Sequence, residues 1–306
     1  MMSTTENKLI ENRYDFVYLF DCQDGNPNGD PDADNSPRTD PETSQGLVSD
    51  VCIKRKIRDF VFYANPNSGS IETGEYNIFV QSGNTLESRQ RLPFEQITGP
   101  EKIEPKGKDT KPKDIEKARQ WMCKHFFDIR AFGAVMSTTN FNCGQVRGPA
   151  QITFSRSIDR ILPTEHTISR QAFTGEKDIK PGTGTLGRKH TIPYGLYRGY
   201  GFINPVFAGQ TGFGENDLAL LWKALGNLFD LDRSAARGKM AVRGLHIFKH
   251  DCRLGNAQAQ GLFDRIVVKK NDGAETPRSF SDYTVNPPEP DALPSGVTYI
   301  DGLALT

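Results

Sequence analysis

RYDFVYLF, residues 13–20, is the stretch from which we predict the fold. Its aromatic and β-branched residues are typical of a β-strand. Side chains alternate along a strand, so four aromatic side chains share one face. They are Tyr14, Phe16, Tyr18 and Phe20. This face fits either a stacking platform for RNA bases or a surface packed under a helix.

The segments that follow add two helices and three strands. Ser49 is placed to cap a helix, with Asp50 at its positive end and Ile53 and Ile57 on a core-facing stripe. The expected elements are a helix over 49–62, strands over 151–159 and 190–203, a helix over 215–229 and a strand over 242–249. The order strand, helix, strand, strand, helix, strand is the βαββαβ pattern of ferredoxin-like and RNA-recognition folds. We therefore expect an α+β protein.

Insertions interrupt this pattern. Residues 64–113 are broken by glycine and proline, with a short strand expected near 76–80 and a helix over 114–127. Residues 160–190 hold two extended stretches around the tip GEKDIKPGTGTLG, which predicts a protruding β-hairpin. The tail beyond 272 is proline-rich and is expected to be peripheral.

Composition favours a globular protein without a decisive net charge. Hydrophobic residues make up 36% and charged residues 25% of 306 residues, and 38 Lys+Arg balance 38 Asp+Glu. Five scattered cysteines without a CxxC pair argue against a zinc module or a disulfide framework and fit a reducing cytoplasm. The start, MMSTTENKLIENRYDF, lacks an apolar core, and no segment has roughly 18 consecutive apolar residues. We expect a cytoplasmic protein that contacts no membrane.

Four basic patterns could bind nucleic acid. The helix over 49–62 carries Lys54, Arg55, Lys56 and Arg58, of which Lys54, Arg55 and Arg58 share the face opposite the apolar stripe. The tract 233–250 contains basic residues and no acid. The residues of this tract that we expect to contact nucleic acid are Arg233, Arg237, Lys239 and Arg243. A solvated surface explains either pattern as well as phosphate binding does.

The other two patterns are shorter. The hairpin adds Arg170, Arg188, Lys189 and His190 beside Phe173, a mixture that suits splayed single-stranded RNA or an ordinary polar surface. In NCGQVRGP (142–149), Gln145 and Arg147 could reach sugar or phosphate.

An acidic loop follows the first strand. Its seven acids are Asp21, Asp24, Asp30, Asp32, Asp34, Asp40 and Glu42. The DxDxD spacing at 30–34 fits a cation-binding loop, but the glycine and the twelfth-position Glu of an EF-hand are missing. The loop could hold the metals of a nuclease, or it could form turns closed by Asx side chains. GTGTLG (182–187) follows no strand and opens no helix, so we assign it no phosphate-binding role. We predict no catalytic residues, metal or cofactor.

Several specific runs together resemble the backbone subunit of type I-C CRISPR Cascade complexes, the Cas-seven family of the RAMP superfamily. They are DGNPNGDPDADNSPRTDPET (24–43), GLVSDVCIKRKIRDFV (46–61), DIRAFGAVM (128–136), NCGQVRGP (142–149), GRKHTIPYGLYRGYGFI (187–203) and DRSAARGKM (232–240). The resemblance covers most of the chain to about residue 265. It implies a subunit that binds the guide crRNA without catalysis and stacks head to tail with copies of itself. The other implied partners are the target DNA strand paired to the guide and further Cascade subunits.

The resemblance also implies a hand-like architecture with an RRM-like palm. The expected parts are a first palm segment over 1–63, an inserted finger-like region over 64–127, palm over 128–159, a thumb hairpin over 160–190, the second palm part over 191–270 and the tail over 271–306. Two alternatives stay open. One is a metal-dependent RNA endonuclease that uses the aspartates of 21–34. The other is an interaction protein without a nucleic-acid role, which would bind RNA weakly and without salt dependence.

Overall fold

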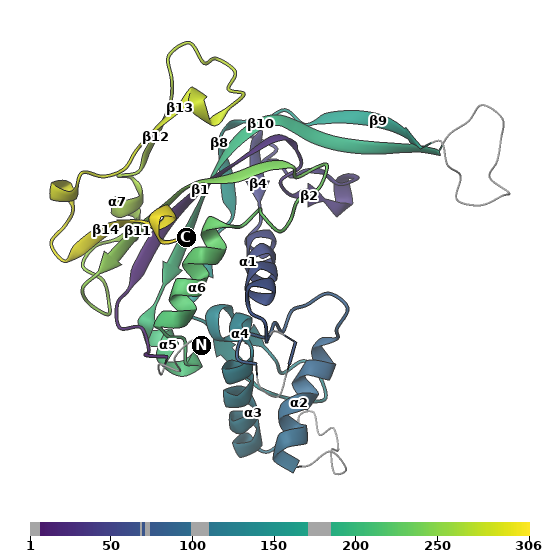
Figure 1. The fold of residues 1–306 in the computed structure, drawn as a ribbon, viewed down its shortest axis with the longest axis vertical. Helices are drawn as coiled ribbons and strands as arrows, with labels where there is room; N and C mark the ends of the chain where they lie inside the picture. Colours follow the sequence, from purple (N-terminus) through teal and green to yellow (C-terminus); the bar gives the residue numbers. More distant parts are fainter. Residues whose placement is uncertain (1–6, 68, 71–73, 99–109, 171–184) are drawn as a thin grey trace.

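A large antiparallel sheet organises the protein in the computed structural model, which describes residues 7–67, 69–70, 74–98, 110–170 and 185–306 (Figure 1). The strands lie in the order β14-β11-β1-β10-β8-β4, and β7 and β9 also pair with β10. Their bounds are β1 Tyr14–Gly25, β4 Gln45–Val48, β7 Ala150–Ile152, β8 Ser155–Arg160, β9 Thr164–Arg170, β10 Thr185–Ile203, β11 Lys239–His250 and β14 Val297–Asp301. The predicted mixed α and β class is confirmed.

The predicted order of elements recurs along the chain. β1 is followed by helix α1 (Asp50–Ala64), then β8 and β10, helix α6 (Glu215–Gly226) and β11. In the sheet these four strands are neighbours in the order β11-β1-β10-β8. β1 begins where expected but runs to Gly25, five residues into the predicted loop, because β10 and β11 pair with it along this length. The predicted strand over 151–159 divides into β7 and β8.

The aromatic face of β1 is buried. Phe16, Tyr18 and Phe20 are fully covered in the core that α1 and α6 share with the sheet. The Phe16 ring meets Trp222 edge-on at 5.2 Å between centroids. Gly201 on β10 leaves room for the Phe16 ring, since a Cβ there would lie 2.0 Å from Phe16 Cζ. The packed-surface interpretation of this face is therefore confirmed, and the platform interpretation is wrong.

The opposite face of the sheet is covered as well. Val17, Leu19 and Phe248 join a second core under helix α7 (Ala259–Phe263) and the small sheet of β12 (Val267–Lys270) and β13 (Tyr283–Asn286). The tail is more than a peripheral extension, because β14 pairs with β11 as a strand of the main sheet. Its alternation Val-Thr-Tyr-Ile is short and follows a proline-rich segment, so the sequence did not single it out.

A helical lobe lies beside α1 (Figure 1). It contains α2 (Leu86–Thr98), α3 (Pro112–His125) and α4 (Phe127–Phe132), with a core of its own around Phe126 and Met122. The small strands β5 (Gly133–Val135) and β6 (Gln145–Arg147) pair at its side. The strand expected near 76–80 is replaced by one parallel bridge between Asn77 and Phe126, and α2 was missed because Pro93 lies inside it.

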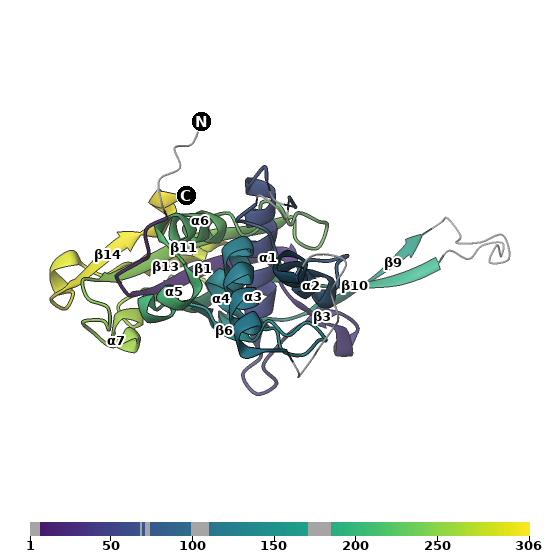
Figure 2. The same ribbon diagram turned by 90° about the horizontal axis from the view of Figure 1, so that it is seen from below.

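A β-hairpin projects from the body, as predicted. β9 and β10 pair from Thr164↔Thr191 to Arg170↔Thr185, and both views show these strands leaving the sheet (Figures 1 and 2). Most of the predicted glycine-rich tip lies outside the described residues. The remaining short elements are β2 (Gly29–Asp30), β3 (Ser36–Pro37), α5 (Pro205–Thr211) and the 3-10 helices at Pro31–Ala33, Phe280–Asp282, Pro290–Ala292 and Gly302–Leu305. Within the described ranges, no helix is both long and apolar enough to cross a bilayer.

Candidate nucleic-acid interface

The cations of α1 divide into buried and exposed groups. Ser49 caps the helix as predicted, its Oγ accepting from the Cys52 N–H. Lys54 pairs with Asp50 at 2.9 Å and Arg58 with Asp128 at 2.8 Å. The Lys54 ammonium and the Arg58 guanidinium both lie over the Phe132 ring, at 5.6 and 5.5 Å from its centroid. These two side chains are mostly covered, because the helical lobe packs beside the face that the sequence left open to solvent.

Lys56 is the most buried of the four, with 3% of its side chain exposed. It forms an ion pair with Asp232 and lies over the Phe229 ring at 5.3 Å. Because the nearby Asp232 also pairs with Arg237 at 3.3 Å, the contact joins α1 to the loop before β11. A covered ammonium cannot meet a phosphate without giving up this contact. In this structure Lys56 thus contacts the loop before β11 and does not face solvent.

Arg55 has the opposite environment. Its side chain is 73% exposed and forms only a long, 3.7 Å ion pair with Asp59. It lines an open groove of about 740 Å³ bounded by α1, residues 78–82 and the Leu231–Asp232 pair. Four exposed apolar side chains belong to the same groove: Val51, Tyr63, Val80 and Leu231. A groove with an exposed, weakly paired guanidinium and exposed apolar surface suits an unpaired polyanionic strand.

The 233–250 tract contains no acid, but acids from elsewhere meet each of its candidate cations. Arg233 pairs with Asp230 at 2.7 Å and donates to the Gly238 carbonyl at 2.9 Å. The other pairs are Arg237–Asp232 at 3.3 Å, Lys239–Asp24 at 3.7 Å and Arg243–Asp21 at 2.9 Å. Of these cations, Lys239 is the most open to solvent, with 64% of its side chain exposed, against 49% for Arg233, 39% for Arg243 and 35% for Arg237.

Asp21 fixes the guanidinium of Arg243, whose side chain is 39% exposed. Its carboxylate is almost wholly covered and accepts from Arg243 Nε at 2.9 Å and from the Tyr194 hydroxyl at 3.1 Å. Burial raises the pKa of Asp21, and the Arg243 guanidinium opposes that shift. The Arg243 guanidinium also lies 5.3 Å from the Phe280 ring centroid. Arg243 therefore fastens β11 to the end of β1.

The base of the hairpin carries exposed cations. Arg188, with 66% of its side chain exposed, pairs with Glu165 at 3.2 Å and with Asp34 at 3.9 Å. His190 lies 3.7 Å from the same Asp34 carboxylate, and Lys189 is half-buried beside it. Phe173 and the side chain of Arg170 lie outside the described residues.

Gln145 and Arg147 lie on β6, a different hairpin from the other candidates. Arg147 is exposed and lies over the Phe207 ring of α5 at 4.3 Å. Gln145 donates to Ser137 Oγ at 3.3 Å. The structure thus joins the α1 and 233–250 candidates through the shared Asp232, and joins Arg188 and His190 of the hairpin through the shared Asp34. The β6 pair lies apart from both groups.

The acidic loop forms the turns that its Asx residues predict. Asp30 Oδ1 accepts from the Asp32 N–H at 3.2 Å, and Asp40 Oδ1 accepts from the N–H groups of Glu42 and Thr43 at 3.0 and 3.2 Å. A hydrogen bond from Arg156 lowers the pKa of Asp40 to about 2. Among the described residues, no cluster of three or more His, Cys, Asp or Glu side chains is placed to hold a metal ion. The Asx-turn interpretation is confirmed.

The acids that position the cations were not predicted from the sequence. Asp128 and Asp232 lie 70 and 176 residues from their partners on α1. Asp128 accepts from Arg58 and from the N–H groups of Phe79 and Val80, and so fixes one wall of the groove. The one local signal is that Asp232 directly precedes the basic tract.

Comparison with known proteins gives a consistent set of relatives. The family model described as "CRISPR-associated protein Cas7" matches residues 12–287. A protein of Haloferax volcanii named CRISPR-associated protein Cas7 is 24% identical over 297 residues, which cover 90% of this chain and 80% of the relative. A chain of a "CRISPR RNA-guided surveillance complex, pre-nicking" aligns with TM-score 0.47 and 14% identity, covering 77% of this chain and 78% of that one. A second, from a "CRISPR RNA-guided surveillance complex", aligns with TM-score 0.41 and 12% identity over 77% and 68% of the two chains.

Proposed function

The chain belongs to the Cas7 family of CRISPR-associated proteins, and from this premise we propose that it is the guide-RNA-binding backbone subunit of a type I-C surveillance complex. The observation that carries the binding role is the open groove along α1, where exposed Arg55 lies among Val51, Tyr63 and Leu231. Cation and apolar surface together suit a phosphate backbone with unstacked bases.

We propose that the fold works as a hand. The neighbouring strands β11-β1-β10-β8, with α1 and α6 on one face, support a ferredoxin-like palm. The helical lobe with α2 and α3 is the finger-like part, and the β9/β10 hairpin is the thumb. The palm does not present stacking aromatics on β1, because both faces of the sheet are covered. We therefore propose that RNA contacts the edges of the palm, at α1 and at the base of the hairpin.

The exposed ion pairs provide the chemistry of this contact. Arg55, Lys239 and Arg188 pair with carboxylates that are themselves exposed. Such pairs are worth about 0–1 kcal/mol each, so a phosphate can replace the carboxylate at little cost. The contacts would carry no sequence information, which suits a subunit whose target is read by base pairing with the guide.

We further propose that copies of the chain stack head to tail along the guide and join other Cascade subunits, with the target DNA strand paired to the guide. A head-to-tail contact is heterologous and therefore extends into a filament. We propose binding without cleavage, because the acids of residues 21–42 that form ion pairs or close turns have structural roles. The free thiols fit the reducing cytoplasm in which we propose the complex acts.

Co-expression with a guide tests this function. The protein is purified at moderate salt, its nucleic acid is extracted, and the extract is treated with RNase or DNase. We expect a discrete RNase-sensitive species of guide length that elutes with large oligomers. The variant R55Q/R188Q/K239Q should retain less guide than D24N/D34N/D59N, a matched change of three charges in the opposite direction. A monomer free of guide in the wild type would refute the proposal.

A further inference from the structure

The main sheet opens beside the base of the projecting hairpin. β10 pairs with β9 as far as Thr191↔Thr164 and with β8 only from Tyr197↔Ser157. Between these points the neighbouring chain turns away, and the Ile161 N–H donates to the Ser44 carbonyl at 2.9 Å instead. The ladder is thus interrupted beside residues 193–196, and their backbone edge faces a slot.

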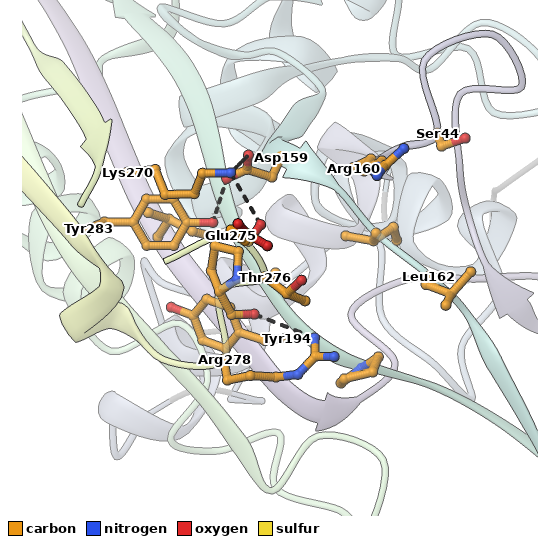
Figure 3. Close-up of a pocket in the computed structure, with 15 residues that line it drawn as sticks. Ser44, Asp159, Arg160, Leu162, Tyr194, Lys270, Glu275, Thr276, Arg278 and Tyr283 are labelled. Atoms are coloured by element: carbon orange, nitrogen blue, oxygen red, sulfur yellow. Dashed lines mark hydrogen bonds and ion pairs between the residues drawn. The ribbon is translucent and has the colours of Figure 1, made fainter. Parts of the chain in front are cut away.

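A pocket of about 540 Å³ occupies this slot (Figure 3). One wall comes from β10 and the segment after β8, and the other from the loop between β12 and β13, at 275–278. The volume lies within the range of roughly 300–1,000 Å³ that is typical of small-molecule sites. Tyr194 lies on the face of the sheet opposite α1, in the core of Val17 and Leu19. The pocket is therefore separate from the α1 groove.

Its charged lining favours an anion. Arg160, Lys270 and Arg278 line the pocket against the carboxylates of Asp159 and Glu275. Asp159 is already occupied, because it accepts from the Tyr283 hydroxyl at 2.7 Å and lies 3.5 Å from Lys270 Nζ. In the described part of the chain, neither Arg160 nor Arg278 forms an ion pair, in contrast to most arginines of the molecule. Arg278 donates to the carbonyl of the adjacent Pro277 at 3.5 Å, and neither guanidinium is held by a carboxylate of the described residues, so both can turn to a ligand.

Its apolar lining favours a base. Leu162, which is 75% exposed, and Pro193 present apolar surface to the pocket, whereas the Tyr194 and Tyr283 rings pack against each other at 6.4 Å and are only 6% and 7% exposed. The backbone edge of β10 adds polar groups in fixed positions, of the kind that can bond to a base edge. The guanidinium groups match a phosphate, the apolar surface matches the face of a base, and the polar backbone edge matches base hydrogen bonding.

We propose that this pocket binds one unpaired nucleotide of a single-stranded nucleic acid other than the guide. The phosphate lies between Arg160 and Arg278, and the base lies against Leu162 and Pro193. The assignment does not depend on the α1 groove, since the two sites share no lining residue. Single-stranded DNA and RNA present the same chemistry here, and they differ in the 2′-hydroxyl.

The test uses the full chain saturated with unlabelled guide RNA, so that the guide path is filled. Labelled dT12 and U12, chosen without complementarity to the guide, are titrated and followed by fluorescence anisotropy across a range of salt. For R160Q/R278Q we expect affinity about tenfold weaker and a log–log salt slope smaller by about 0.7, the contribution of one phosphate contact on a single strand. E275Q should strengthen binding about twofold, since it removes a competing carboxylate.

The matched control is K8Q/R253Q, which removes two exposed cations away from both sites. It should bind the oligonucleotides as the wild type does. A preference for dT12 or for U12 supports the proposal and identifies the strand. Equal binding by R160Q/R278Q and the control would overturn it. R160Q/R278Q must also retain as much guide as the wild type. Lower guide retention would show that the pocket is part of the guide-binding path, and it would also overturn the inference.

Discussion

Helix α1 and the base of the β9/β10 hairpin carry similar basic residues in different environments. On α1, Arg58 pairs with the buried Asp128, whereas on the hairpin Arg188 pairs with the exposed Glu165. The buried carboxylate receives three donors and joins two parts of the fold, while the exposed one receives a single guanidinium on an open surface. The burial of the partner acid therefore separates cations that hold the structure from cations that can exchange a carboxylate for a phosphate.

Asp128→Ala gives the largest expected difference between the two regions. It leaves Arg58 and two backbone N–H groups covered without an acceptor, so the free energy of unfolding should fall by about 3–5 kcal/mol. Glu165→Ala should stay within about 0.5 kcal/mol of the wild type, because a solvated partner is lost. Urea denaturation measures both. Equal effects of the two changes would contradict the distinction drawn from burial.

Lys56→Met and Arg55→Gln compare a buried cation with an exposed one at adjacent positions of α1. Met fills the space of the covered Lys56 but leaves Asp232 without its ammonium, a loss of about 1–3 kcal/mol. Arg55→Gln should leave the stability almost unchanged and weaken RNA binding. Thermal unfolding and RNA titration of both variants separate the two roles. Wild-type stability of Lys56→Met would show that its ion pair does not hold the loop.

The sequence predicted the elements whose signals are local. The strand face of Phe16 and Phe20, the Ser49 cap and the paired stretches of the hairpin each follow from residues within one element. Helix α2 was not predicted because proline usually breaks a helix, and strand β14 was not predicted because it is short. These two elements depend on tertiary packing, which a local pattern does not contain.

The same limit applies to the candidate site. Arg55, Arg188 and Lys239 were predicted and remain exposed. Lys54 and Arg58 were predicted to lie on an open face and are instead covered, because the Asp128 and Phe132 that receive them belong to a lobe far along the chain. Basic residues can be found from sequence, but the acids that neutralise them must be located in three dimensions.

Asp34→Asn gives the smallest expected effect and acts on the hairpin alone. Asp34 lies 3.9 Å from Arg188 and 3.7 Å from His190, so its loss removes one of the two carboxylates that compete with a phosphate for Arg188. Guide affinity should rise about twofold, in keeping with the few tenths of a kcal/mol of an exposed pair. Asp272→Asn, an equal charge change on the C-terminal segment, serves as the control in the same titration. Matching gains in both variants would indicate a general charge effect.

The salt dependence of guide binding tests the central claim most directly. Each phosphate neutralised on a single strand contributes about 0.7 to the slope of log affinity against log salt. If Arg55, Arg188 and Lys239 each contact one phosphate, the slope of R55Q/R188Q/K239Q should be smaller than that of the wild type by about 2. Unfolding measured alongside should show unchanged stability. A slope equal to that of the wild type, in a fully folded variant, would contradict the assignment of these exposed cations to the guide.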